Sequence, residues 1–282
     1  MDNSIRNFLQ NTLFVRDIKC IFCGEELEKD SRYCVCDSCL STLPFISQKV
    51  CKHCGEPIES LAEYCMRCKN HIDRGFDKAR AVFLYKDKIK KSISDFKFFN
   101  KRYLGEYLSH FLLDLYIKEN WSCDLVIPAP ISQKSLKVRG FNQTDLLCSA
   151  FIDYGISFDN TSIIKHLETP HQVGLGYKDR QTNLIGAFKV TNKNAIKNKK
   201  ILLVDDIFTT GATISEIAST LKKAGASEVY ALTLCHEMPE NRKNWQLMIF
   251  FVIVQNNDFG KYVKIVFIFF NYLIDLCWVM DL

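Results

Sequence analysis

The stretch ILLVDDIFTTGATISEIASTLKKAG, residues 201–225, carries most of the information about the fold. Residues 201–204 are an uninterrupted apolar run, which is typical of a buried parallel strand. Asp205 and Asp206 stand at its carboxyl end, and the small-residue segment TTGAT follows. An amphipathic helix is expected from about Ile214, with Gly225 as its stop. This order predicts an α/β fold with an anion site where the strand ends.

The loop after the acidic pair is expected to bind a phosphate group. Amides at a helix N-terminus point at an anion, and threonine hydroxyls add donors. A carboxylate pair would repel that anion unless it addressed something else, such as ribose hydroxyls or Mg²⁺. A Walker-type nucleotide loop is excluded, because no G-x4-G-K-[ST] motif is present. The alternative is a strand that ends in two solvated acids before an N-cap threonine. The candidate phosphate ligands are Thr209, Thr210, Gly211, Ala212 and Thr213.

Nine of the 13 cysteines lie between Cys20 and Cys68, and eight of these form four successive C-x2-C pairs. Two such pairs can complete the tetrahedral thiolate shell of a zinc ion. We favour two sequential sites over an interleaved arrangement. Zinc would then supply folding energy rather than chemistry, since a fully Cys-ligated ion leaves no position open for water. The expected ligands are Cys20, Cys23, Cys36 and Cys39 for the first ion, and Cys51, Cys54, Cys65 and Cys68 for the second.

Other residues of this cysteine-rich head have secondary roles. Gly24 and Gly55 each follow a cysteine pair, and a positive φ there would let the backbone turn its amides toward the thiolates. Cys34 and His53 are possible substitute ligands, although a bystander thiol and a solvated histidine are the simpler interpretation.

Length, charge and the N-terminus place further bounds on the protein. A chain of 282 residues can bury a full α/β core and carry a small second module. The net charge of +5 is uneven, because residues 79–200 alone carry 20 bases and 11 acids. A polyanion-binding surface is therefore expected in this middle region. The first 19 residues lack an apolar run and include Asp2 and Asp17, so we expect no signal peptide and a cytoplasmic location.

Residues 86–103, KDKIKKSISDFKFFNKRY, contain seven Lys or Arg and several aromatic residues. Ile89, Ile93 and Phe96 share one face of a predicted helix. The segment is either a strip that binds single-stranded DNA with aromatic stacking, or a solvated basic face above core phenylalanines. The candidate nucleic-acid contacts are Lys90, Lys91, Lys97 and Lys101.

Two further blocks precede the acidic pair. Residues 125–127 form an apolar strand that ends in Pro-Ala-Pro, and a basic loop containing Lys137 and Arg139 follows, which suits a diphosphate. Residues 166–188 place Gln172, Arg180 and Asn183 in a possible active-site loop or acceptor region.

The blocks occur in one order: cysteine pairs, P-x-P, R-G-F-N-Q, Q-x7-R-x2-N-x2-G-A-F and VDDIFTTGAT. This combination, over residues 20–235, resembles the ComF family of phosphoribosyltransferase-like proteins. The resemblance implies a double zinc ribbon at 15–75 and a type I phosphoribosyltransferase-like parallel sheet at 79–238. It implies that Asp205 and Asp206 bind the ribose hydroxyls of phosphoribosyl diphosphate (PRPP) with Mg²⁺, and that residues 209–213 bind the 5′-phosphate. It also implies a role in DNA uptake with single-stranded DNA and a helicase-like partner.

Three hypotheses for function remain open at this point. The protein is a competence protein that binds PRPP or a related ribose phosphate, a genuine transferase acting on a nucleobase or other small acceptor, or a non-catalytic zinc-ribbon scaffold. The acceptor, and whether turnover occurs, do not follow from the motifs.

The last 43 residues differ in composition from the rest. Residues 1–239 contain 48 Ala, Ser, Thr and Pro, and residues 240–282 contain none. We interpret residues 239–282 as a frameshifted, read-through or disordered tail. A membrane anchor at 262–280 is the competing interpretation, although Lys264, Asn271 and Asp275 interrupt it. A genuine accessory segment is the third, and membrane association is expected only if the tail is genuine.

Overall fold

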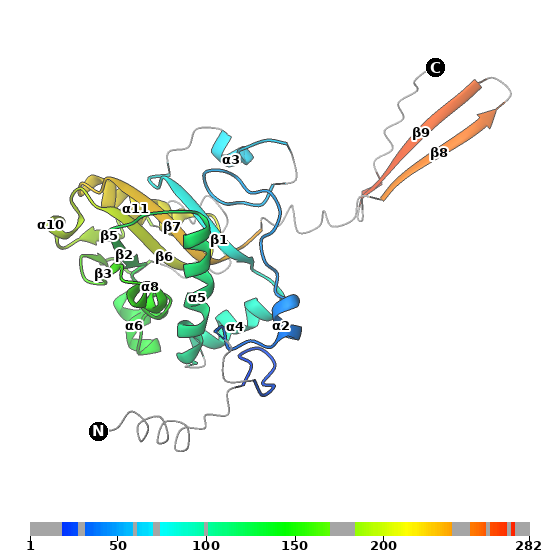
Figure 1. Ribbon diagram of the computed structural model, residues 1–282. Helices are drawn as coiled ribbons and strands as arrows, with labels where there is room; N and C mark the ends of the chain where they lie inside the picture. The colour runs from blue at the N-terminus through cyan, green and yellow to red at the C-terminus, as the bar shows by residue number, and fades with distance from the viewer. Residues whose placement is uncertain are drawn as a thin grey trace. The chain divides into compact units, whose positions relative to one another are not determined.

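The computed structural model of the chain describes residues 19–27, 32–58, 61–69, 74–98, 101–169, 184–238, 249–257, 260–269 and 272–273. The chain divides into two compact units, Met1–Glu237 and Met238–Leu282. The first unit contains both the cysteine-rich head and the sheet, so these two parts pack together as one body (Figure 1).

A parallel sheet of five strands organises the first unit, in the order β1-β7-β6-β2-β3. Each neighbouring pair in it is parallel. The apolar run of residues 201–204 lies in the central strand, where all four side chains are fully buried. The α/β expectation is therefore confirmed. The strands are β1 (Lys78–Leu84), β2 (Leu125–Pro128), β3 (Ser157–Phe158), β6 (Lys200–Phe208) and β7 (Glu228–His236).

Helices cover both faces of this sheet (Figure 1). Leu202 and Val204 belong to a core with α4 (Asp87–Phe98), α5 (Tyr103–Lys118) and α8 (Ser149–Asp153). Ile201 and Leu203 belong to a second core with α11 (Ala212–Lys223). Successive residues of β6 therefore face opposite layers, as the pleat of a strand requires. Shorter elements complete this unit: α6 (Gln133–Arg139), α7 (Gln143–Leu146), β4 (Ile163–Lys165), β5 (Phe188–Val190) and α10 (Lys193–Ile196).

The cysteine-rich head packs directly on the sheet. Phe45 forms an antiparallel bridge with Phe83 of β1, and the Ala79 amide of β1 donates to the His53 carbonyl at 2.7 Å. The first ribbon, with α2 (Asp37–Ser41), adds its buried residues to the α5 core, and the second, with α3 (Met66–Lys69), adds its residues to the α11 core. The two ribbons thus extend both hydrophobic layers of the domain.

Several predicted elements occur as expected, with shifted ends. α4 forms within the basic segment, and β2 ends at Pro128. α11 begins at Ala212, two residues earlier than predicted, and Gly225 follows it with a φ of +101°. The basic loop predicted around Lys137 and Arg139 is wrong: these residues lie in α6, which Ser132 caps by accepting from the Ser135 amide.

The second unit contains the antiparallel strands β8 (Ile249–Asn257), β9 (Gly260–Phe269) and β10 (Tyr272–Leu273). In the segment considered as an anchor, residues 260–269 and 272–273 are strands, and residues 274–282 lie outside the described part. Within the described ranges, the chain has no helix with the length and apolar character needed to span a membrane.

Candidate functional site

The carboxyl ends of β2 and β6 lie at the point where the connections of the sheet change direction. β2 leads to β3 on one side, whereas β6 leads through α11 to β7 on the other side. The last contact between β2 and β6 is the Ala129 amide, which donates to the Val204 carbonyl at 2.8 Å. Open α/β sheets bind ligands outside such a switch point, and Asp205 and Asp206 follow Val204 directly.

β6 continues through both acids to Phe208, four residues beyond its predicted end. Asp205 lies opposite Thr233 of β7, and Phe208 lies opposite His236. Since side chains alternate along a strand, the two carboxylates leave β6 on opposite faces. Their contacts differ accordingly: Asp206 meets α4 and α7, whereas Asp205 interacts with Lys165 at the end of β4.

Asp206 is the centre of a buried polar network. Its Oδ2 forms an ion pair with Nζ of Lys97 at 2.7 Å. The Lys97 side chain is 18% exposed and the Asp206 side chain is 8% exposed. Nε2 of Gln143 donates to the same oxygen at 3.1 Å, and Oε1 of Gln143 accepts from Nη1 of Arg139 at 2.8 Å. Lys97 therefore belongs to the acidic site rather than to a free basic surface.

Asp205 is held differently. Its Oδ1 accepts from the Asp206 amide at 2.8 Å. Burial, followed by the charge of Asp206, raises the pKa of Asp205 to about 7, while Lys97 and Lys165 act in the opposite direction. Ionisation of Asp205 is therefore costly until a cation or a hydrogen-bond donor compensates the charge.

Three cations surround the two acids. Burial lowers the pKa of Arg139 and of Lys165. The charge of Asp206 opposes that shift at Arg139, and the charges of Glu168 and then Asp205 oppose it at Lys165. Together with Lys97, these cations reduce the electrostatic objection to a phosphate beside an acidic pair, because nearby positive charge offsets the repulsion.

The loop after β6 has the form expected of an anion site. Gly211 has a φ of +79°, and α11 begins at the next residue. The Ala212 amide donates to the Thr210 hydroxyl at 3.3 Å, while the other amides of the first helical turn have no intrahelical acceptor. Thr209 and Thr213 are half-buried. Beneath the loop, Arg74 donates to the Thr210 carbonyl, a contact that no local motif predicts.

The residues predicted to bind the diphosphate or the acceptor differ in where they lie. Lys137 is exposed on α6, whereas Arg139 at the end of the same helix is half-buried in the Asp206 network. Gln143 is a member of the site that sequence reasoning missed, although it ends the quoted R-G-F-N-Q block. The predicted residues Gln172, Arg180 and Asn183 lie outside the described residues.

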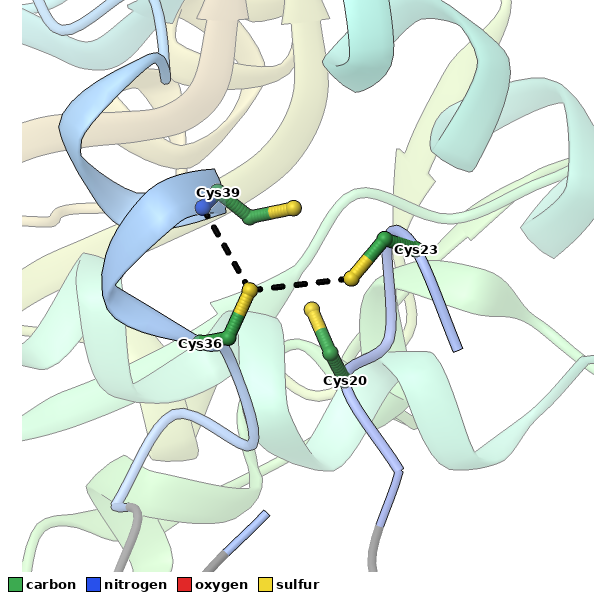
Figure 2. Close-up of side chains that lie close together, drawn as sticks. All are labelled: Cys20, Cys23, Cys36 and Cys39. Atoms are coloured by element: carbon green, nitrogen blue, oxygen red, sulfur yellow. Dashed lines mark hydrogen bonds between the residues drawn. The ribbon is translucent and has the colours of Figure 1, made fainter. Parts of the chain in front are cut away.

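The first metal centre is formed by Cys20, Cys23, Cys36 and Cys39, whose sulfur atoms lie within 4.8 Å of one another. Figure 2 shows the four side chains converging, Cys20 and Cys23 from one segment and Cys36 and Cys39 from the start of α2. The Cys23 and Cys36 sulfurs are 3.6 Å apart, close to the separation of about 3.8 Å that a tetrahedral zinc site with 2.3 Å bonds requires. The donor set therefore fits zinc.

The second centre is formed by Cys51, Cys54, Cys65 and Cys68 within the same distance limit. The sequential pairing is thus confirmed over the interleaved one. Cys34 stands apart and donates to the Lys19 carbonyl. His53 is not a solvated side chain: Nδ1 lies 3.4 Å from the Cys68 sulfur, and Nε2 lies 2.9 Å from the Phe76 carbonyl oxygen.

Two glycines follow the first cysteine pair of each metal centre. Gly24 and Gly55 have φ values of +79° and +72°, as predicted. Their amides, however, donate to the carbonyl oxygens of Cys20 and Cys51 rather than to the thiolates. The turn is therefore held by main-chain hydrogen bonds.

The basic segment is only partly a surface strip. Ile89, Ile93 and Phe96 are buried, so Phe96 cannot stack on a base. Lys101 is ion-paired with Asp95 at 2.7 Å. Lys90 and Lys91 are exposed.

Two family models match the chain. The phosphoribosyl transferase domain matches residues 157–264, and the double zinc ribbon domain matches residues 9–69. Together with the parallel sheet and the two cysteine tetrads, these matches define a phosphoribosyltransferase-domain protein that carries a double zinc ribbon.

Curated relatives narrow this class. Competence protein F of Haemophilus influenzae is 32% identical over 55% of this chain and 70% of its own length. Competence protein ComFC of Streptococcus pneumoniae is 29% identical over 77% of this chain and 99% of its own length. The chain therefore belongs to the ComF family.

Other matches are shorter or more distant. The DNA utilization protein YhgH of Salmonella typhi is 33% identical over 41% of this chain, and the match spans half of that relative's length. Among solved structures, adenine phosphoribosyltransferase from Saccharomyces cerevisiae matches 53% of this chain and 78% of its own, with 16% identity and a TM-score of 0.32.

Proposed function

We propose that this protein binds PRPP, or a related ribose phosphate, at the carboxyl end of β6 and handles single-stranded DNA during natural competence. The observation that carries this proposal is the charge-compensated acidic pair beside the loop at residues 209–213. Carboxylates without cations would repel a phosphate, and cations without carboxylates would not select hydroxyl groups. The combination favours a ligand that carries both phosphate and vicinal hydroxyls.

The ligand groups can be assigned to neighbouring parts of the site. The amides of the first turn of α11, with the hydroxyls of Thr209 and Thr213, suit the 5′-phosphate. Asp205 and Asp206 suit the ribose hydroxyls. Arg139 and the exposed Lys137 are the candidates for the diphosphate, because fixed cations offset its charge.

Mg²⁺ fits the same proposal. Carboxylate and phosphate oxygens are its preferred ligands, and it commonly binds one or two carboxylates together with substrate phosphates. Asp205 and Asp206 supply such oxygens. Since Lys97 already pairs with Asp206, a metal-bound ligand would have to share or displace that contact.

The role in DNA handling rests on the family and on the exposed part of α4. The matched relatives are named competence and DNA utilization proteins. Lys90 and Lys91 offer exposed positive charge for a phosphate backbone, whereas Lys97 and Lys101 are engaged in ion pairs. We place this activity in the cytoplasm, with a helicase-like competence protein as the partner.

Calorimetry with PRPP and Mg²⁺ tests the pocket on the zinc-loaded full chain. Asp205→Asn and Asp206→Asn should each weaken PRPP binding, while Asp95→Asn, which removes an acid paired with Lys101, should not. Absence of binding by the wild type, or equal binding by all four proteins, would refute a working pocket and favour the scaffold hypothesis.

Two further measurements separate the remaining functions. Release of diphosphate from PRPP across a panel of nucleobase acceptors would identify a transferase, and binding without release would identify a ligand-binding competence protein. Fluorescence anisotropy with a single-stranded oligonucleotide should show weaker binding and a shallower salt dependence for Lys90→Ala/Lys91→Ala. Unchanged affinity and salt slope would exclude this part of α4 as the DNA site.

A further inference from the structure

Arg74 lies in the segment that joins the second metal centre to the sheet, and it reaches the loop after β6. Its guanidinium carbon lies 5.5 Å from the centroid of the Phe76 ring and 5.4 Å from that of the Phe208 ring. Nη2 donates to the Thr210 carbonyl. The residue is 4% exposed, so its contact with the loop is part of the buried interior.

The contact with Thr210 orients the peptide that follows it. A trans peptide is planar, so its N–H points away from its C=O. When Arg74 holds the Thr210 carbonyl, the Gly211 amide is directed to the opposite side of the loop. That amide has no acceptor in the part of the chain that the structure describes. Arg74 therefore presents a backbone donor for an anion.

The charge of Arg74 acts in the same direction. Nη1 is buried and has no hydrogen-bond partner, and Arg74 forms no ion pair with a described residue. A buried cation without a carboxylate raises the local positive potential. Gly211 leaves room for it, because a Cβ at that position would lie 2.7 Å from Nη2 and 2.5 Å from the Phe208 ring.

The same segment is tied to the second metal centre. The ring of His53 stacks on Phe76 with centroids 4.8 Å apart. Its two nitrogens contact the Cys68 sulfur and the Phe76 carbonyl. Phe76 lies two residues after Arg74. A continuous series of contacts therefore joins the metal ligand Cys68, through His53, Phe76 and Arg74, to the loop after β6. The donor set of this centre fits zinc, so the ion would fix Cys68 and, through it, His53.

We propose that Arg74 is a positioning residue for the phosphate-binding loop, and that the second zinc centre holds Arg74 in place through His53 and Phe76. This inference rests on the proposed ribose-phosphate site and adds to it a residue and a coupling. Loss of the second zinc ion then weakens phosphate binding, whereas loss of the first does not.

Two readouts on the zinc-loaded full chain test the proposal. The first is the affinity for PRPP with Mg²⁺, and the second is amide hydrogen exchange of residues 209–214 without ligand. Arg74→Met should weaken PRPP binding about tenfold to a hundredfold, the range for a lost hydrogen bond to a charged group, and should speed exchange in the loop. Arg74→Lys, which keeps the charge, should retain part of the affinity.

The coupling is tested with His53→Phe, which keeps the ring stack but removes both hydrogen bonds and leaves all eight cysteines intact. It should speed loop exchange and weaken PRPP binding in the same direction as Arg74→Met. Cys68→Ser should do the same, with Cys36→Ser in the first centre as its matched control.

Different results would overturn the role of Arg74, the coupling to the second metal centre and the proposed function. Unchanged loop exchange and PRPP affinity in Arg74→Met would overturn the role of Arg74. Wild-type behaviour of His53→Phe, or an equal effect of Cys36→Ser and Cys68→Ser on the loop, would overturn the coupling to the second centre. If the wild type does not bind PRPP, the proposed function fails, while hydrogen exchange still decides whether Arg74 and His53 order the loop.

Discussion

Replacing Lys97 by Met tests whether the acidic site depends on a cation supplied by α4. The Asp206 side chain is 8% exposed, and its carboxylate would keep the Gln143 amide but lose the ammonium at 2.7 Å. Breaking a buried pair by removing one partner costs about 3 kcal/mol or more, and here the charge of Arg139 would be left to act alone on Asp206. For a folded unit of this size, that corresponds to a melting temperature lower by about 6 to 12 °C.

The assay is urea unfolding at fixed zinc concentration, arranged as a double-mutant cycle. Lys97→Met/Asp206→Asn should recover most of the loss, since no buried charge is then left alone. Lys101→Met is the matched control: its pair with Asp95 has the same 2.7 Å length, but Lys101 is 43% exposed, so the expected loss is below about 1 kcal/mol. Equal losses for Lys97→Met and Lys101→Met, or strictly additive effects in the cycle, would refute the reasoning.

Three other experiments probe different parts of the chain. Asp205→Asn should stabilise the unliganded protein, because the pKa of Asp205 is about 7 in the folded state and 3.8 ordinarily. The folded wild type therefore binds a proton that the unfolded chain has released, so its stability falls as the pH rises toward 7. The stability gained by Asp205→Asn should be about 2 kcal/mol larger at pH 8 than at pH 5.5. A gain independent of pH in urea unfolding would contradict this. Gly24→Ala should lower the free energy of unfolding by about 1 to 2 kcal/mol, because Gly24 has a positive φ. Gly55→Ala should lower it further and reduce the zinc content, since the new Cβ would lie 2.6 Å from the Ala79 carbonyl oxygen. Equal unfolding midpoints for the two variants would count against this difference. Chelation of zinc should unfold the head and also lower the stability of the sheet, measured by circular dichroism, because Cys51 and Cys54 are buried within the α11 core; an unaffected sheet would show that the ribbons fold independently.

Much of the architecture follows from short-range patterns. The apolar run at 201–204 and the helix that follows Gly211 occur as predicted, because strand and helix formation depend on neighbouring residues. The metal tetrads also follow from spacing, since each C-x2-C pair forms a local turn. The basic loop around Lys137 was wrong because Ser132 caps a helix there, a local signal that the prediction overlooked.

The partners of the acidic pair do not follow from any local pattern. Lys97 precedes Asp206 by 109 positions, and the sequence makes it only a candidate nucleic-acid contact, because the charge of α4 gives no indication of which lysine turns inward. Gln143 reaches Asp206 from α7, 63 positions earlier in the chain. Such contacts depend on how the layers pack, so a single sequence cannot specify them.

Spacings of a few residues are enough to indicate the cysteine-rich head and the succession of strand, acidic pair, loop and helix in an α/β domain. The packing of the layers places Lys97, Arg139 and Lys165 near the two acids on opposite faces of β6. It also brings Arg74 into contact with the loop, and His53 into contact with the second metal centre. These relations join residues far apart in the chain, and burial of the two hydrophobic layers is what brings them together.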